Sequence, residues 1–293
     1  MSWTFEPIAG PFSFTEGPAW DGEAVLFSNC PENRIMRYHP ASGECSLFRS
    51  NTNEANGLMF DKDGQLYACE GNSQGDTHRI VRYNKDRSTT IIADNFEGKK
   101  LNSPNDLAFD KEGRLWFTDP RYGDKADKLE LDHQSVFRAD PLPDDIWNLT
   151  RVTYDTTKPN GLLISPDQKT LYVAQSEYKL KMELRAYPIN TDGSLGKYSV
   201  LHNFSPHRGI DGMCLDTEGN IIATAGFEES GPGPMIYIFD PNGRVLETHP
   251  VPGDNPTNCT FGDGDLRTLY VTADGCLFRT RTNHTGYLIF PQK

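Results

Sequence analysis

The segment NDLAFDKEGRLWFT (residues 105–118) has two short apolar runs separated by a turn that ends in Gly113. Related segments occur five more times, as EGPAWDGEAVLFS (16–28), NGLMFDKDGQLYA (56–68), NGLLISPDQKTLYVA (160–174), DGMCLDTEGNIIAT (211–224) and NCTFGDGDLRTLYVT (258–272). In most of them an Asp opens the turn and supplies a side-chain acceptor, while the Gly tolerates positive φ. Each segment therefore predicts a β-hairpin.

The six segments are spaced along the whole chain. They begin at residues 16, 56, 105, 160, 211 and 258, with spacings of 40, 49, 55, 51 and 47. A third strand-like run follows each hairpin, at residues 34–38, 78–83, 135–139, 182–187, 235–239 and 276–280. Three or four strands in a unit of this length are typical of a propeller blade, whereas a β-sandwich does not normally repeat one hairpin six times. We predict an all-β, six-bladed β-propeller that forms a single domain over residues 1–293.

The last unit is one strand short. Residues Cys259–Thr280 supply only about three strands, so we expect Trp3–Ile8 to add a strand to the last blade. This pairing would close the ring and remove the exposed strand edges that promote aggregation.

The first residue of each repeat is polar. Because the innermost strand of a blade lines the central tunnel, these six side chains are expected to converge on one tunnel mouth. They are Glu16, Asn56, Asn105, Asn160, Asp211 and Asn258. Two carboxylates and four carboxamides provide oxygen ligands and no sulfur or imidazole. This set suits Ca²⁺ best, with Mg²⁺ or Mn²⁺ as alternatives. The pattern favours a central metal-binding tunnel; the competing interpretation is that these residues cap strand ends and bind water.

Composition restricts the partners. The formal charge is −12, from 29 basic and 41 acidic residues, and no block of Lys and Arg stands out. We therefore expect no nucleic-acid partner and no membrane partner. The first residues lack the layout of a secretory signal, which favours a cytoplasmic protein, although a signal removed earlier would leave no trace. Both a monomer and a homodimer fit the sequence.

Six short motifs together resemble the senescence marker protein/gluconolactonase/luciferin-regenerating enzyme family, which is related to the squid-type diisopropylfluorophosphatases. They are TEGPAW (15–20), LNSPND (101–106), FTDPRYG (117–123), KPNG (158–161), GIDGM (209–213) and NCTFG (258–262). The second and third motifs are similar to those of the bacterial and fungal gluconolactonase branch. The resemblance implies a metal-dependent lactonase with a small sugar lactone as substrate and one divalent cation, most commonly Ca²⁺, with Mg²⁺, Mn²⁺ or Zn²⁺ as alternatives.

The resemblance also implies which residues form the site. Its metal ligands match Glu16, Asn105, Asn160 and Asp211, and Asp211 takes the role of general base. Because a carboxylate bound to a cation is a weaker base, Asp211 could instead orient the water. The animal sugar-lactone enzymes carry an Arg where this chain has Ser103, so the contacts of that Arg do not transfer.

Further residues are candidates for substrate binding. They are Ser103, Asn105, Asp119, Tyr122, His207 and Asn258. Two of them have a structural alternative, since Asp119 could stabilise a turn and His207 could be a solvated surface residue rather than a donor or proton shuttle. Two other functions remain open: a phosphotriesterase of the diisopropylfluorophosphatase kind, and a non-enzymatic propeller that binds a protein or sugar.

Overall fold

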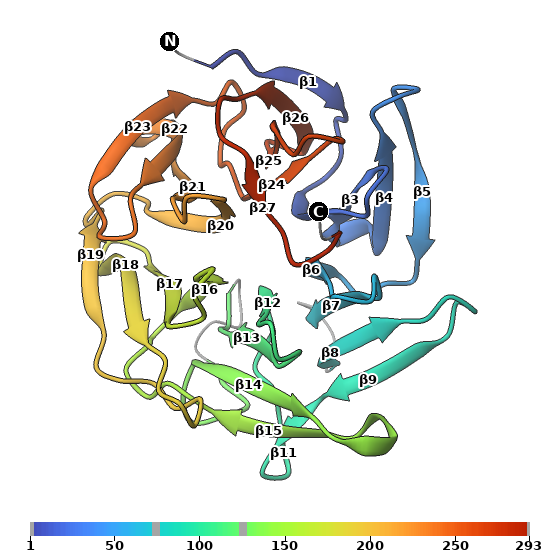
Figure 1. Cartoon of the computed structure of the whole chain (residues 1–293), viewed down its shortest axis with the longest axis vertical. Coiled ribbons are helices and arrows are strands. Elements are labelled where there is room, and N and C mark those ends of the chain that lie inside the picture. The colour runs from blue at the N-terminus through green and yellow to red at the C-terminus, as the bar shows by residue number, and fades with distance from the viewer. Residues whose placement is uncertain (1–2, 72–76, 123–127, 292–293) are drawn as a thin grey trace.

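The computed structural model describes residues 3–71, 77–122 and 128–291. Within these residues, six antiparallel sheets of at least four strands surround a common centre (Figure 1). The predicted six-bladed β-propeller is therefore confirmed. Gly123 of the third motif lies outside the described residues, and the single domain over residues 1–293 stays a prediction.

The blades follow one another in chain order. The first contains β2 (Thr15–Trp20), β3 (Val25–Asn29), β4 (Arg34–His39) and β5 (Glu44–Ser50). The second contains β6 (Ala55–Phe60), β7 (Leu66–Gly71), β8 (His78–Tyr83) and β9 (Thr89–Ala93). The third contains β12 (Leu107–Phe109), β13 (Leu115–Asp119), β14 (Ser135–Pro141) and β15 (Trp147–Arg151). The fourth contains β16 (Pro159–Ile164), β17 (Thr170–Glu177), β18 (Lys181–Pro188) and β19 (Ser199–Asn203).

The last two blades include strands from both ends of the chain. The fifth contains β20 (Ile210–Asp216), β21 (Ile221–Phe227), β22 (Ser230–Phe239), β23 (Val245–Pro250) and the late strand β27 (Gly286–Tyr287). The sixth contains β24 (Asn258–Gly262), β25 (Thr268–Ala273), β26 (Cys276–Arg281) and β1 (Glu6–Ala9). A small hairpin of β10 (Asn95–Phe96) and β11 (Lys99–Lys100) and the 3₁₀ helices η1 (Cys30–Glu32) and η3 (Pro143–Asp145) lie in connections. Among the described residues, no helix has the length and apolar character required to cross a membrane.

The turn chemistry explains the hairpins. The Asp110 carboxylate accepts hydrogen bonds from the backbone amides two and four residues later, both at 3.0 Å. Gly113 in the same turn has a φ of +81°. Asp61 and Asp216 make the same pair of bonds in the second and fifth blades. The Asp supplies the acceptor and the Gly the positive φ, as the repeat predicts.

The N-terminal strand closes the ring as predicted. Strand β1 pairs antiparallel with β26, with Glu6 opposite Arg279. Arg279 Nε donates to Glu6 Oε2 at 2.9 Å. The strand spans Glu6–Ala9 rather than the predicted Trp3–Ile8, and the Trp3 ring instead stacks flat on His249, with ring centroids 3.9 Å apart.

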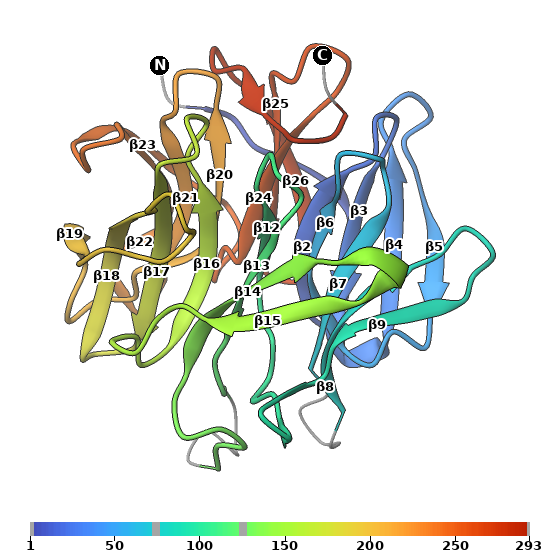
Figure 2. The same ribbon diagram turned by 60° about the horizontal axis from the view of Figure 1, so that its bottom comes forward.

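The C-terminal segment crosses one face of the ring of blades. After β27 it runs over the centre of the ring (Figure 1), and the same segment, in red, lies on the upper side of Figure 2. Each of four consecutive side chains packs on a different apolar cluster between blades: Tyr287, Leu288, Ile289 and Phe290. With the innermost strands they line an apolar cavity of about 90 Å³. We call residues 286–290 the C-terminal plug. The predicted metal-binding tunnel stays a prediction.

Candidate functional site

The first residue of the repeat lies in a β-bulge in four of the six blades. The register shifts at residues 16–19, 55–58, 159–162 and 210–213, where a three-residue step on the innermost strand faces a two-residue step on its partner. A bulge locally bends a strand and re-aims its side chains. These bulges place the polar first residues at the mouth while the rest of each strand keeps its apolar packing.

Glycine after the first residue lets neighbouring blades approach closely. A Cβ on Gly57 would lie 2.7 Å from the Asn105 carbonyl oxygen, and one on Gly161 would lie 2.5 Å from the Asp211 carbonyl oxygen. The Gly57 amide donates to Asn105 O at 2.9 Å. Since real Cβ atoms do not make such contacts, any larger residue would push the polar positions apart.

Hydroxyl groups tie adjacent blades together at the same level. Ser28 Oγ in β3 donates to Asn56 O of the second blade at 2.7 Å. Thr257 Oγ1, just before β24, donates to Thr15 O of the first blade at 2.8 Å. These bonds hold the first residues of the repeats at fixed spacing around the mouth.

Three buried carboxyl groups influence one another at this mouth. Burial and the negative charges of Asp211 and Asp106 raise the pKa of Glu16 well above its usual value. Burial raises the pKa of Asp106 to about 7. Burial also raises the pKa of Asp211, although the Arg208 guanidinium and the Asn160 carboxamide oppose this. Ionising all three in the absence of a cation is unfavourable, and a bound divalent cation would relieve this cost.

The four predicted ligands have the chemistry of a calcium site. Glu16, Asn105 and Asn160 are 3%, 9% and 8% exposed, and the Asp211 side chain is 16% exposed. In the part of the chain that the structure describes, no three His, Cys, Asp or Glu side chains form a metal-binding group. A cation held here would therefore use the two carboxamide oxygens as well as the two carboxylates. This all-oxygen donor set fits a hard cation.

Two of the predicted substrate residues belong to the same group. Tyr122 is 36% exposed, and Asp211 and Asn160 are among the groups that influence its hydroxyl. The Asn258 side chain interacts with both Glu16 and Asp106. Tyr122 and Asn258 thus lie beside the predicted ligands, and substrate contacts by these two residues and by Asn105 stay a prediction.

Asp119 lies beneath the loop that contains Ser103 and leads to the mouth. Asp119 is fully buried, and its two carboxylate oxygens accept hydrogen bonds from the backbone amides of Asn102 and Ser103, both at 2.8 Å. Burial raises the pKa of Asp119 to about 7. The Asp119 side chain therefore stabilises the segment immediately before Asn105. Substrate contacts by Asp119 and Ser103 stay a prediction.

The structure brings Arg208 to the mouth, and substrate binding by its neighbour His207 stays a prediction. His207 is exposed, and its Nδ1 lies 2.9 Å from Ser230 Oγ. Arg208 Nη2 donates to Asp211 Oδ2 at 2.6 Å. Sequence reasoning missed this ion pair, although the spacing of three residues between Arg208 and Asp211 is a usable signal.

Two cavities adjoin this ion pair. The first has a volume of about 220 Å³ and is lined by Tyr122, Asn160, Ser176, Tyr178, Met182, Arg208, Ile210, Asp211, Phe227 and Asn255. The second, of about 260 Å³, is lined by Phe12, Ser13, Phe14, Thr15, Arg208, Asp211, Asn255, Thr257, Asp274 and Gly275. Aromatic walls with a few convergent polar groups are typical of a small-molecule site. The shared wall places Asp211 in contact with both cavities.

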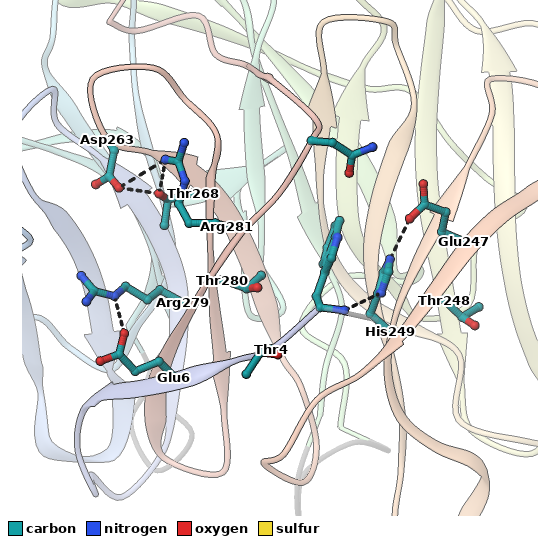
Figure 3. A pocket seen from close by; sticks show the side chains of 12 residues that line it. Thr4, Glu6, Glu247, Thr248, His249, Asp263, Thr268, Arg279, Thr280 and Arg281 are labelled. Carbon is teal, nitrogen blue, oxygen red and sulfur yellow. Dashed lines mark hydrogen bonds and ion pairs between the residues drawn. The ribbon is translucent and has the colours of Figure 1, made fainter. Parts of the chain in front are cut away.

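A larger concavity lies elsewhere. It has a volume of about 1150 Å³ and is formed by β1, the sixth blade and the edge of the fifth (Figure 3). Its charged side chains bind one another: Arg279 contacts Glu6 at 2.9 Å, and His249 contacts Glu247 at 2.9 Å (Figure 3). Its size therefore does not make it the better candidate, because the buried carboxyl groups gather at the tunnel mouth.

Comparison with known proteins identifies similar chains. The family model described as the SMP-30/Gluconolactonase/LRE-like region matches residues 14–275. A gluconolactonase from Zymomonas mobilis is 32% identical, with 98% of this chain and 83% of that protein aligned. The pentonolactonase XacC of Haloferax volcanii is 28% identical over 89% of this chain and 81% of that protein. The solved structure of a gluconolactonase from Xanthomonas campestris superposes with a TM-score of 0.79 at 31% identity, covering 95% of this chain and 89% of the other.

Proposed function

The chain belongs to the SMP-30/gluconolactonase/LRE-like family, and we propose that it is a divalent-cation-dependent hydrolase that opens a sugar lactone. Relatives named gluconolactonase and pentonolactonase support the lactone. The observation that carries the cation is the group of interacting buried carboxyl groups, Glu16, Asp106 and Asp211, surrounded by carboxamides. The adjoining cavity of about 220 Å³ has room for a small ring.

Glu16, Asn105, Asn160 and Asp211 are the proposed ligands. A calcium ion bound by them supplies a Lewis acid that stabilises negative charge on the lactone carbonyl oxygen. Arg208 holds Asp211 Oδ2, so the other carboxylate oxygen would bind the cation and, through its second lone pair, orient the attacking water or accept its proton. Tyr122 and Asn258 supply hydrogen-bonding groups for the sugar.

The walls of the cavity support the same proposal. Tyr178 and Phe227 pack edge to face, with ring centroids 5.8 Å apart, and both line the 220 Å³ cavity beside Asp211. Aromatic side chains offer a flat apolar surface to the C–H groups of a sugar ring.

A paired assay tests the function. Protein treated with a chelator and then dialysed is given δ-gluconolactone or diisopropylfluorophosphate, each with and without added Ca²⁺. We expect lactone hydrolysis that is lost on chelation and restored by Ca²⁺, together with a lower melting temperature in the chelated state.

The other outcomes separate the alternatives. Hydrolysis of the fluorophosphate with no lactone turnover would assign a phosphotriesterase that uses the same mouth. No turnover of either compound, with an unchanged melting temperature after chelation, would favour a non-enzymatic binding propeller and refute both the cation and the lactone.

A further inference from the structure

Arg208 is held by the walls of the mouth as well as by Asp211. Its Nη1 donates to Gly226 O at 2.7 Å and to Pro256 O at 3.3 Å. Its Nη2 donates to Asp211 Oδ2 at 2.6 Å and to Pro256 O at 3.4 Å. The guanidinium therefore connects the end of β21, the segment before β24 and the Asp211 carboxylate at the start of β20.

These contacts leave the terminal nitrogens of Arg208 little capacity to bind a substrate. Two backbone carbonyls and one carboxylate oxygen already accept from them. The planar, forked guanidinium suits such fixed multiple contacts, which a lysine ammonium cannot reproduce. Since the carbonyls belong to the backbone, they fix the guanidinium, and the guanidinium in turn fixes one oxygen of Asp211.

The pair is also largely shielded from water. The Arg208 and Asp211 side chains are 17% and 16% exposed. A charge at such a site acts on its neighbours more strongly than it would on an open surface. Arg208 therefore attracts Asp211 and repels any cation that Asp211 helps to bind.

We propose that Arg208 is a positioning residue with two opposed effects: it orients Asp211 for the reaction, and it weakens cation binding at the mouth. This inference rests on the proposed cation site. It differs from a general stabilising role because replacing Arg208 should strengthen calcium binding while it slows the reaction.

The test measures calcium binding and catalysis separately in chelated and reloaded protein. In Arg208→Gln, isothermal titration with CaCl₂ should give a dissociation constant on the order of tenfold lower, because a repelling charge is gone. The same variant should lose about tenfold in kcat on δ-gluconolactone with a smaller change in KM, because Asp211 is no longer held. Arg208→Lys should retain calcium affinity near that of the parent and still lose kcat, since the charge remains but the fork is lost.

Arg138→Gln is the matched control. Arg138 Nε binds Asp140 Oδ1 at 2.8 Å, and the two side chains are 12% and 23% exposed, but they lie on β14 away from the mouth. This control should leave calcium affinity and kcat unchanged. It shows how much of any effect comes from losing a half-buried ion pair.

Different results refute the proposed cation site and the proposed role of Arg208. Parallel losses of calcium affinity and kcat in Arg208→Gln would make Arg208 a merely structural residue, and unchanged values would make it a bystander; either result overturns the inference. If the parent protein itself binds no calcium, the proposed cation site is refuted, and the inference about Arg208 is refuted with it.

Discussion

Gly161→Ala should disturb the tunnel mouth without removing any polar group. Gly161 follows Asn160, and its missing Cβ is what lets β16 approach the backbone of β20. An added Cβ would lie 2.5 Å from the Asp211 carbonyl oxygen and 3.0 Å from the Gly212 Cα. The substitution therefore acts on the spacing between two proposed ligands on adjacent blades.

The size of the effect follows from this overlap. A carbon and a carbonyl oxygen normally come no closer than about 3.3 Å, so the two strands must separate by roughly 0.8 Å or distort locally. Overpacking of this kind costs about 1–3 kcal/mol of unfolding free energy. That corresponds to a decrease of about 2–10 °C in melting temperature. Metal–ligand distances tolerate only about 0.2 Å, so calcium affinity should fall at least about tenfold.

Thermal melts with and without Ca²⁺ and calcium titration calorimetry would measure both effects. Gly264→Ala is the control, because a Cβ there meets no atom within 4 Å and the backbone does not have a positive φ. If Gly161→Ala melts and binds calcium like the parent, the close approach of the blades does not set the site. A loss of stability with unchanged calcium affinity would confirm the steric overlap but refute its effect on calcium binding.

Three further predictions concern the mouth and the plug. Asp211→Asn should keep the fold by circular dichroism and reduce lactone turnover by about 100-fold or more; turnover equal to that of the parent would refute the role of Asp211. The pKa of Asp106 is raised to about 7, so chelated protein should melt at a lower temperature at pH 8 than at pH 5.5. The reason is that the carboxyl ionises in the unfolded chain from about pH 4 but resists ionisation in the folded one. Added Ca²⁺ at pH 8 should reduce the difference in melting temperature. A higher melting temperature for chelated protein at pH 8 than at pH 5.5 would contradict this prediction. Deleting residues 286–293 removes four packed apolar side chains and should cost more than about 2 kcal/mol by urea unfolding, and an unchanged midpoint would show that the plug adds no stability.

The features predicted correctly are those that residues close together in the sequence determine. The turn at Asp110 and Gly113 depends on residues within five positions, and six copies of it specify the blades. The pairing of β1 with β26 followed because the last repeat was one strand short. The convergence of the polar first residues on one mouth was predicted on the same basis, because the innermost position is the same in every blade, and their role as a site stays a prediction.

Other features depend on contacts that no repeat encodes. The burial of Asp119 against residues 102–103 follows from the path of one loop. The sequence alone therefore could not decide whether Asp119 stabilises a turn or binds substrate. The ion pair of Arg208 with Asp211 depends on carbonyl groups supplied by two other segments. Residues 286–290 carry no repeat signature, and their path over the ring is specified only by the apolar clusters that they reach.

The C-terminal plug covers one end of the ring and leaves the polar mouth as the open end. Under the proposed function, a lactone that enters at the polar mouth would not leave past Tyr287 and Phe290, because these side chains pack between the blades at the far end. The opened acid would then depart by the route through which its precursor arrived, so that substrate entry and product release would share one opening.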